Sequence, residues 1–80
     1  MYKLSWNGIT LEFRDKLNKG FERDILHFLA ELAAIVKEEA IGPWMTTPNK
    51  AFDNRSPIQE IEENGLEALK EMLVSLGAGQ

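Results

Sequence analysis

The sequence predicts a mainly α-helical domain with one long central helix, short C-terminal helices and an N-terminal β-hairpin. From Phe21 onward, apolar residues recur at spacings of three and four, the pattern of one helix face. The pair Ser56-Pro57 opens a second helical pattern. The pair Asn7-Gly8 separates two alternating apolar runs, which is typical of a hairpin.

The composition favours a single small domain that gains stability from a partner. The chain has 80 residues, enough for one modest core. It has no cysteine and one histidine, so disulfides and thiolate metal sites are excluded. The lack of cysteine fits a reducing compartment, and we expect a cytoplasmic protein. Neither a signal-peptide pattern nor an apolar stretch long enough to cross a membrane is visible.

The charge favours a protein partner over nucleic acid. Thirteen acidic and nine basic residues give a net charge of −4, the wrong sign for a chain that neutralises phosphates. Residues 44–80 contain six acidic and three basic residues, whereas residues 1–43 contain seven and six. We therefore expect the C-terminal half to attract a basic partner surface.

Residues 1–20 are predicted to form the hairpin and a connector. With Asn7 and Gly8 as a two-residue loop, every apolar residue of the hairpin falls on one face. A disordered or helical start is the alternative interpretation. The predicted cross-strand pairs are Trp6 with Ile9, Leu4 with Leu11, and Tyr2 with Phe13.

The central helix is predicted over residues 21–41. We expect it to end there because Gly42 is a good C-terminal cap and Pro43 cannot continue the hydrogen-bond ladder. Its apolar face comprises Phe21, Ile25, Phe28, Leu29, Leu32, Ala33, Ile35 and Val36.

After this break, a turn-rich segment leads into two short helices. Ser56 is expected to cap the first helix, with Gln59 completing a capping box, and Gly65 is expected to end it. A second turn is expected at residues 53–55. The last helix carries Leu66, Leu69, Met72, Leu73 and Leu76.

No arrangement of residues points to catalysis, a metal or a cofactor. His27 lies beside the apolar face of the central helix, and its structural interpretation outweighs a catalytic or metal-binding one. The acidic residues of the C-terminal helices are typical of a solvated helix face. We therefore expect a binding protein and not an enzyme.

Residues 44–77 resemble the toxin-binding domain of Xre/MbcA/ParS-type antitoxins. The resemblance lies in the order and spacing of a tryptophan, a Pro-Asn pair, an apolar residue, a turn, a proline that opens a helix, a glycine and spaced leucines. The residues that carry it include Trp44, Pro48, Asn49, Phe52, Pro57, Gly65, Leu69, Leu73 and Gly77.

The resemblance implies a bacterial antitoxin that binds a cognate RES-domain toxin, which consumes NAD, and obstructs the toxin's active site. By position, the residues that would shape the domain are Trp44, Pro48, Phe52, Pro57, Gly65 and Leu69. The more exposed residues that would contact the partner are Asn49, Arg55, Leu76, Gly77 and Gln80. The alternative is an adaptor module with another protein as its target.

Two features depart from the family pattern. Asn54 stands where the family commonly has glycine, and asparagine also adopts left-handed conformations. The residues before position 44 are too few for the helix-turn-helix that many family members carry, so we expect no nucleic-acid binding by this chain alone. The hairpin's exposed edge would allow a homodimer.

Overall fold

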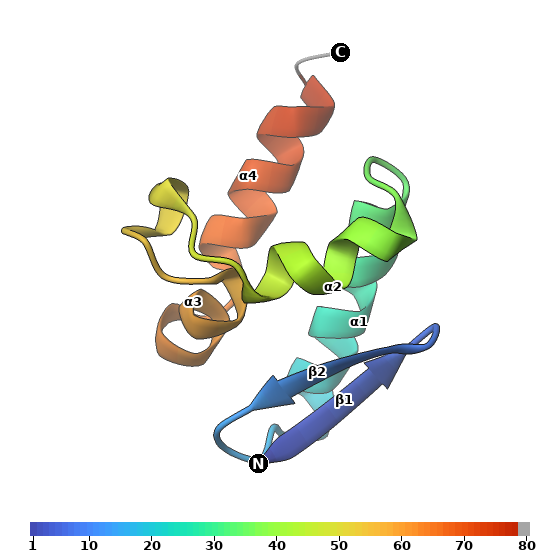
Figure 1. The fold of residues 1–80 in the computed structure, drawn as a ribbon, viewed down its shortest axis with the longest axis vertical. Coiled ribbons are helices and arrows are strands. Elements are labelled where there is room, and N and C mark those ends of the chain that lie inside the picture. Colours follow the sequence, from blue (N-terminus) through green and yellow to red (C-terminus); the bar gives the residue numbers. More distant parts are fainter. Residues whose placement is uncertain (79–80) are drawn as a thin grey trace.

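A computed structural model describes residues 1–78 and confirms the mainly α fold class with an N-terminal hairpin (Figure 1). A short 3-10 helix, η1, lies between the second and third α-helices. The elements are β1 (Tyr2–Trp6), β2 (Ile9–Phe13), α1 (Lys19–Ala33), α2 (Glu38–Thr46), η1 (Lys50–Phe52), α3 (Pro57–Asn64) and α4 (Glu67–Ala78).

The hairpin has the predicted register. Leu4 pairs with Leu11, and the loop residues Asn7 and Gly8 have φ angles of 47° and 82°. Positive φ at both loop residues is what a type I′ turn requires. The apolar residues of both strands face the helices and are buried or half-buried, whereas Lys3 and the other alternate residues are exposed.

The predicted helix over residues 21–41 is divided between α1 and the start of α2. The N–H groups of Ile35 and Val36 both donate to the Leu32 carbonyl at 2.9 Å, and Lys37 is extended. A straight helix spanning both elements would be about 40 Å long at about 1.5 Å per residue. The longest dimension of the molecule is 36 Å. The chain therefore folds back at two β-branched residues, which have low helix propensity.

The prediction that Gly42 and Pro43 end a helix is wrong, because both lie inside α2. Pro43 cannot donate the hydrogen bond that would reach back one turn. The helix continues because Ile41 and Met45, which flank this pair, are fully buried. The Thr47 hydroxyl donates to the Pro43 carbonyl at 2.6 Å and so satisfies one acceptor at the helix end.

Helix α2 occupies the centre of the fold. It packs against α1, α3 and β2, so it joins the hairpin to the C-terminal helices (Figure 1). One hydrophobic core results, with contributions from both strands and from every helix, including η1. The core residues are Leu4, Leu11, Phe13, Ile25, Phe28, Leu29, Leu32, Ile41, Met45, Phe52, Ile58, Ile61, Leu66, Leu69 and Leu73.

Helix α3 begins and ends as the sequence predicts. The Gln59 N–H donates to the Ser56 hydroxyl at 3.2 Å, and the Ser56 N–H donates to the Gln59 side chain at 2.8 Å, which is the capping box. Gly65 follows the helix with φ 82° and ψ −162°. Only glycine adopts this conformation without strain, so Gly65 fixes the direction in which α4 leaves α3.

We expect opposite effects from adding a methyl group at two glycines. A Cβ atom at Gly42 would lie 3.7 Å from Ile9 Cγ2, an ordinary contact. Gly42→Ala should therefore stabilise α2 by about 0.5–1 kcal/mol. Gly65→Ala should destabilise the protein by about 1–3 kcal/mol, because alanine is strained at that φ and ψ. Denaturant unfolding of both variants tests this, and equal effects would contradict the assignment of the two backbone conformations.

Candidate protein-binding site

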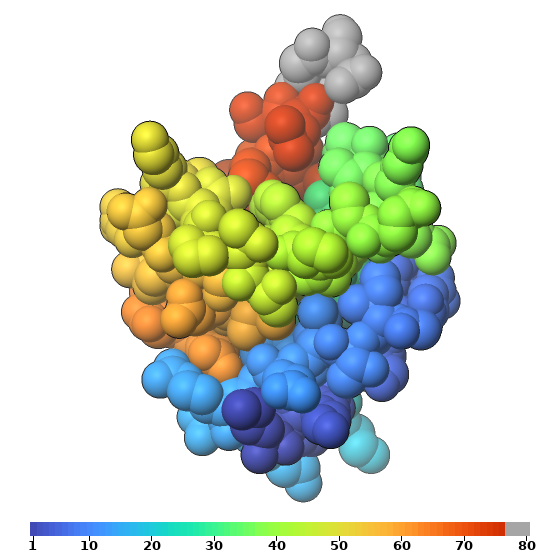
Figure 2. Space-filling model, viewed as in Figure 1, coloured from blue at the N-terminus to red at the C-terminus, as the bar shows by residue number. Residues whose placement is uncertain are grey.

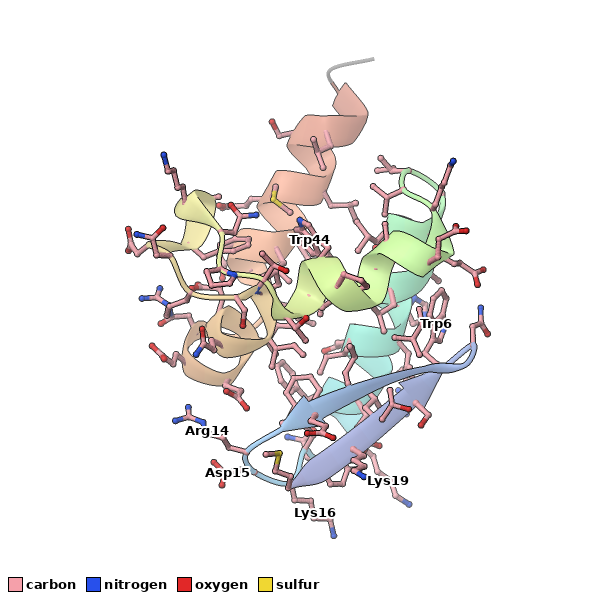
Figure 3. All side chains as sticks on the ribbon, in the orientation of Figure 1. Trp6, Arg14, Asp15, Lys16, Lys19 and Trp44 are labelled. Carbon is pink, nitrogen blue, oxygen red and sulfur yellow. The ribbon has the colours of Figure 1, made fainter. Side chains whose placement is uncertain are left out.

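An apolar groove lies where α1, α2 and α4 meet. Its volume is about 250 Å³. Trp44 on α2 is half-buried and lies beside α4, as Figure 3 shows. The lining residues are Leu32, Val36, Ala40, Trp44, Met72 and Leu76.

The groove forms because two rows of apolar residues face each other. Four of the lining residues are spaced four apart, from Leu32 to Trp44, and this row continues across the break between α1 and α2. Met72 and Leu76 form a second row, also spaced four apart, on α4. Residues four apart on one helix share a face, which applies to Met72 and Leu76 on α4 and to Ala40 and Trp44 on α2. Leu32 and Val36 join the second of these pairs because the chain folds back between α1 and α2.

Large apolar side chains are exposed in and near the groove. Leu76, which lines it, is 45% exposed, and Ile35, next to the lining residue Val36, is 42% exposed. Val74 is 69% exposed but lies two residues from both Met72 and Leu76, and so on the opposite face of α4. Figure 2 shows the last turns of α4, in red, at the top of the molecule beside the segment that joins α1 to α2, in green. Exposed apolar side chains beside a groove are typical of surfaces that bind another protein.

Asn49, a predicted contact residue, organises the loop around η1. Its side chain accepts a hydrogen bond from the Ala51 N–H at 2.9 Å, and its backbone pairs with Arg55. Asp53 and Asn54 have φ angles of 55° and 64°, so the expected turn and the left-handed asparagine are confirmed. Asn49 therefore has a structural role in this loop, and its contact with a partner stays a prediction.

Arg55, the second predicted contact residue in this loop, forms an ion pair with a buried carboxylate. Its Nη2 atom lies 2.7 Å from Glu60 Oε1, and the Glu60 side chain is 7% exposed. Asn64 donates to the other Glu60 oxygen at 3.2 Å. The hydrogen bond to Glu60 raises the pKa of Arg55, so the guanidinium stays charged. Arg55 therefore already has a charged partner within this domain, and its contact with another protein stays a prediction.

The remaining predicted residues are divided between the core and the surface. Phe52, Pro57 and Leu69 are buried, whereas Pro48 is exposed and lies outside the core. Leu76 lines the groove, which does not include Asn49 or Arg55. The loop that holds these two residues lies on the opposite side of α4 from α1 (Figure 1). Gly77 belongs to α4, and Gln80 lies outside the described residues.

A second cleft, of about 590 Å³, is lined by residues of β2 and α3. Its carboxylates are Glu12, Glu62 and Glu63. Glu62 is already paired, since its two oxygens lie 2.6 Å from the Arg14 backbone nitrogen and 3.2 Å from Arg14 Nε. This contact fastens the end of the hairpin to α3.

Residues 1–78 lack the features of two other classes of site. The described part of the chain contains no group of three or more histidine, cysteine, aspartate or glutamate side chains placed to hold a metal ion. None of its helices is long and apolar enough to span a bilayer. His27, the histidine of the sequence analysis, is exposed on α1.

The region that contains the groove matches a known protein family. The family model described as the antitoxin Xre/MbcA/ParS C-terminal toxin-binding domain matches residues 31–79, more than half of the chain. No curated protein and no solved structure shows significant similarity. The predicted resemblance over residues 44–77 is confirmed, and the match begins earlier, at the end of α1.

We expect Arg55→Ala to lower the melting temperature, because the buried Glu60 carboxylate loses its partner. The double variant with Glu60→Gln should recover part of the loss, since the uncompensated charge is removed. Arg23→Ala, at an exposed position on α1, is the control and should change the melting temperature little. Thermal unfolding followed by circular dichroism measures all three, and an unchanged melting temperature for Arg55→Ala would contradict a structural role of this ion pair.

Proposed function

This chain belongs to the Xre/MbcA/ParS antitoxin family through its C-terminal toxin-binding domain, and we propose that it neutralises a cognate RES-domain toxin by covering the toxin's active site. RES-domain toxins are the NAD-consuming partners that the family resemblance implies. Inhibition of this kind requires a preformed surface and no catalysis by the antitoxin itself. The proposal places the protein in the bacterial cytoplasm, where its partner would consume NAD.

The apolar groove carries this proposal. All six of its lining residues fall within residues 31–79, the span of the toxin-binding family. The groove includes Leu76, close to the end of α4, so a partner bound there would lie beside the last turn of this helix. Leu76, Gly77 and Gln80 are the part of that segment that we expect to reach toward the toxin's active site.

Charge defines the complementary surface. Residues 31–79 contain nine acidic and four basic residues, whereas residues 1–30 contain four acidic and five basic residues. Glu31, Glu39 and Glu71 adjoin groove residues in sequence and are exposed. The toxin surface that fits this groove is an apolar segment flanked by lysine or arginine, since interfaces combine a buried apolar centre with a charged rim.

The partners in this proposal are the toxin and a second copy of this chain. Nucleic acid and membranes are not partners of this chain alone. An adaptor with a different protein target is the competing function, and it predicts that a RES-domain protein encoded next to this chain does not bind it.

We expect Leu76→Glu to abolish or strongly weaken neutralisation, because a carboxylate would enter the apolar groove at the interface. The matched control is Val74→Glu, which adds the same charge to the same helix at a position outside the groove. The measurement is growth and cellular NAD level in cells that co-express the RES-domain toxin with each variant, together with the affinity of the purified proteins. We expect a loss of affinity of about tenfold or more for Leu76→Glu, equivalent to about 1.4 kcal/mol.

Val74→Glu should unfold at a temperature close to that of the unchanged protein, because Val74 is 69% exposed. Leu76 is 45% exposed, and Leu76→Glu should lower the unfolding temperature by only a few degrees, so its folded fraction is checked by thermal unfolding before binding is compared. If Leu76→Glu neutralises as well as Val74→Glu, the groove is not the toxin-binding surface. If the unchanged protein does not bind the RES-domain toxin, the antitoxin proposal is wrong for this toxin, and the adaptor function is favoured.

A further inference from the structure

The outer edge of the hairpin has backbone groups available for pairing. The sheet consists of β1 and β2 alone, and β2 is the strand that packs against α2 and α3. In a two-residue hairpin the pair that flanks the loop, Trp6 and Ile9, exchanges hydrogen bonds, and such pairs alternate along the ladder. The N–H and C=O groups of Lys3 and Ser5 therefore point away from β2. No backbone hydrogen bond outside the hairpin, within residues 1–78, involves them.

The sequence of β1 is complementary to itself in one antiparallel register. If Leu4 lies opposite Leu4 of a second copy, then Lys3 lies opposite Ser5. These are the two residues whose backbone groups point outward, so each such pair can exchange both of its hydrogen bonds. No lysine faces a lysine directly. A register centred on Lys3 would place like charges opposite each other, which is unfavourable.

The same register aligns the apolar faces of the two hairpins. Tyr2 and Trp6 lie opposite each other across the two-fold axis, and both are half-buried in the single chain. Because side chains alternate along a strand, Tyr2, Leu4 and Trp6 of each copy would lie on the face that already packs on the helices. An aromatic pair at each end of the new ladder adds to the burial of these rings.

We propose that two copies of this chain associate through their β1 strands, in the register that places Leu4 opposite Leu4, to form a continuous four-stranded antiparallel sheet. A two-stranded hairpin is marginal in water, and two additional strands give it paired neighbours. β1 lies at the opposite end of the molecule from the C-terminal turns of α4 (Figure 1). The dimer therefore leaves both apolar grooves open, and this inference does not depend on the proposed toxin.

Charge determines the salt concentration at which the test is run. Lys3 faces Glu12 across the hairpin, and Asp15 lies at the same end of the molecule as Lys16 and Lys19 (Figure 3). Two copies nevertheless repel each other, because each carries a net charge of −4. Salt screens this repulsion, so association should strengthen as the salt concentration rises.

The experiment compares Ser5→Pro with Ser5→Val in the 80-residue chain. Proline removes the outward N–H without removing a bond to β2, as edge strands tolerate. Valine keeps the N–H. Light scattering and sedimentation equilibrium at micromolar concentration should show a dimer for the unchanged protein and for Ser5→Val. Ser5→Pro should dimerise with an affinity roughly tenfold to a hundredfold weaker, because it loses hydrogen bonds across the dimer interface.

A second measurement keeps the proposal testable if Ser5→Pro does not fold. The sequence has no cysteine, so Ser5→Cys can carry a single nitroxide label. Labels at this position should show strong spin–spin coupling in the dimer, whereas labels at Ser75→Cys on α4, the control, should show none. A monomer at all concentrations and salt levels, a dimer unaffected by Ser5→Pro, or an absence of coupling at position 5 would overturn the proposal.

Discussion

The fold depends on the burial of one face of α2 between the N-terminal and C-terminal parts of the chain. Ile41 and Met45 are fully buried, and α2 contacts α1, α3 and β2. A chain of this size builds a single core. Because α2 contacts elements on both sides of that core, its position determines how the hairpin and the C-terminal helices are arranged. The same burial explains why α2 tolerates Pro43, whose missing hydrogen bond costs less than withdrawing two core residues would.

Features that are determined by neighbouring residues were predicted from the sequence. The hairpin register follows from Asn7-Gly8, because both residues accept the positive φ that a tight turn needs. The start of α3 follows from Ser56 and Gln59, whose side chains complete the cap without help from elsewhere. The family resemblance also rested on short-range spacing, and the family comparison confirms it.

Features that depend on distant residues were missed. The break between α1 and α2 has no glycine or proline to signal it, and the actual Gly42-Pro43 pair lies inside a helix. The ion pair between Arg55 and Glu60 was not predicted, because nothing in the local sequence reveals that the Glu60 side chain is buried. A contact of Arg55 with a partner stays a prediction. The groove combines residues from position 32 to position 76, so no local pattern predicts it, although the spacing of four from Leu32 to Trp44 is a usable signal.

The end of helix α4 carries apolar side chains that the core of the domain does not bury. Its most extensive packing is against α3, and its last core residue is Leu73. Beyond that residue Val74 is 69% exposed and Leu76 is 45% exposed, so the final turns add little apolar burial to the folded chain. A partner that fills the groove would bury this surface, and ligands that bind only the folded state stabilise it. The final turns of α4, which add little to the core, are thus placed to gain stability when a partner fills the groove.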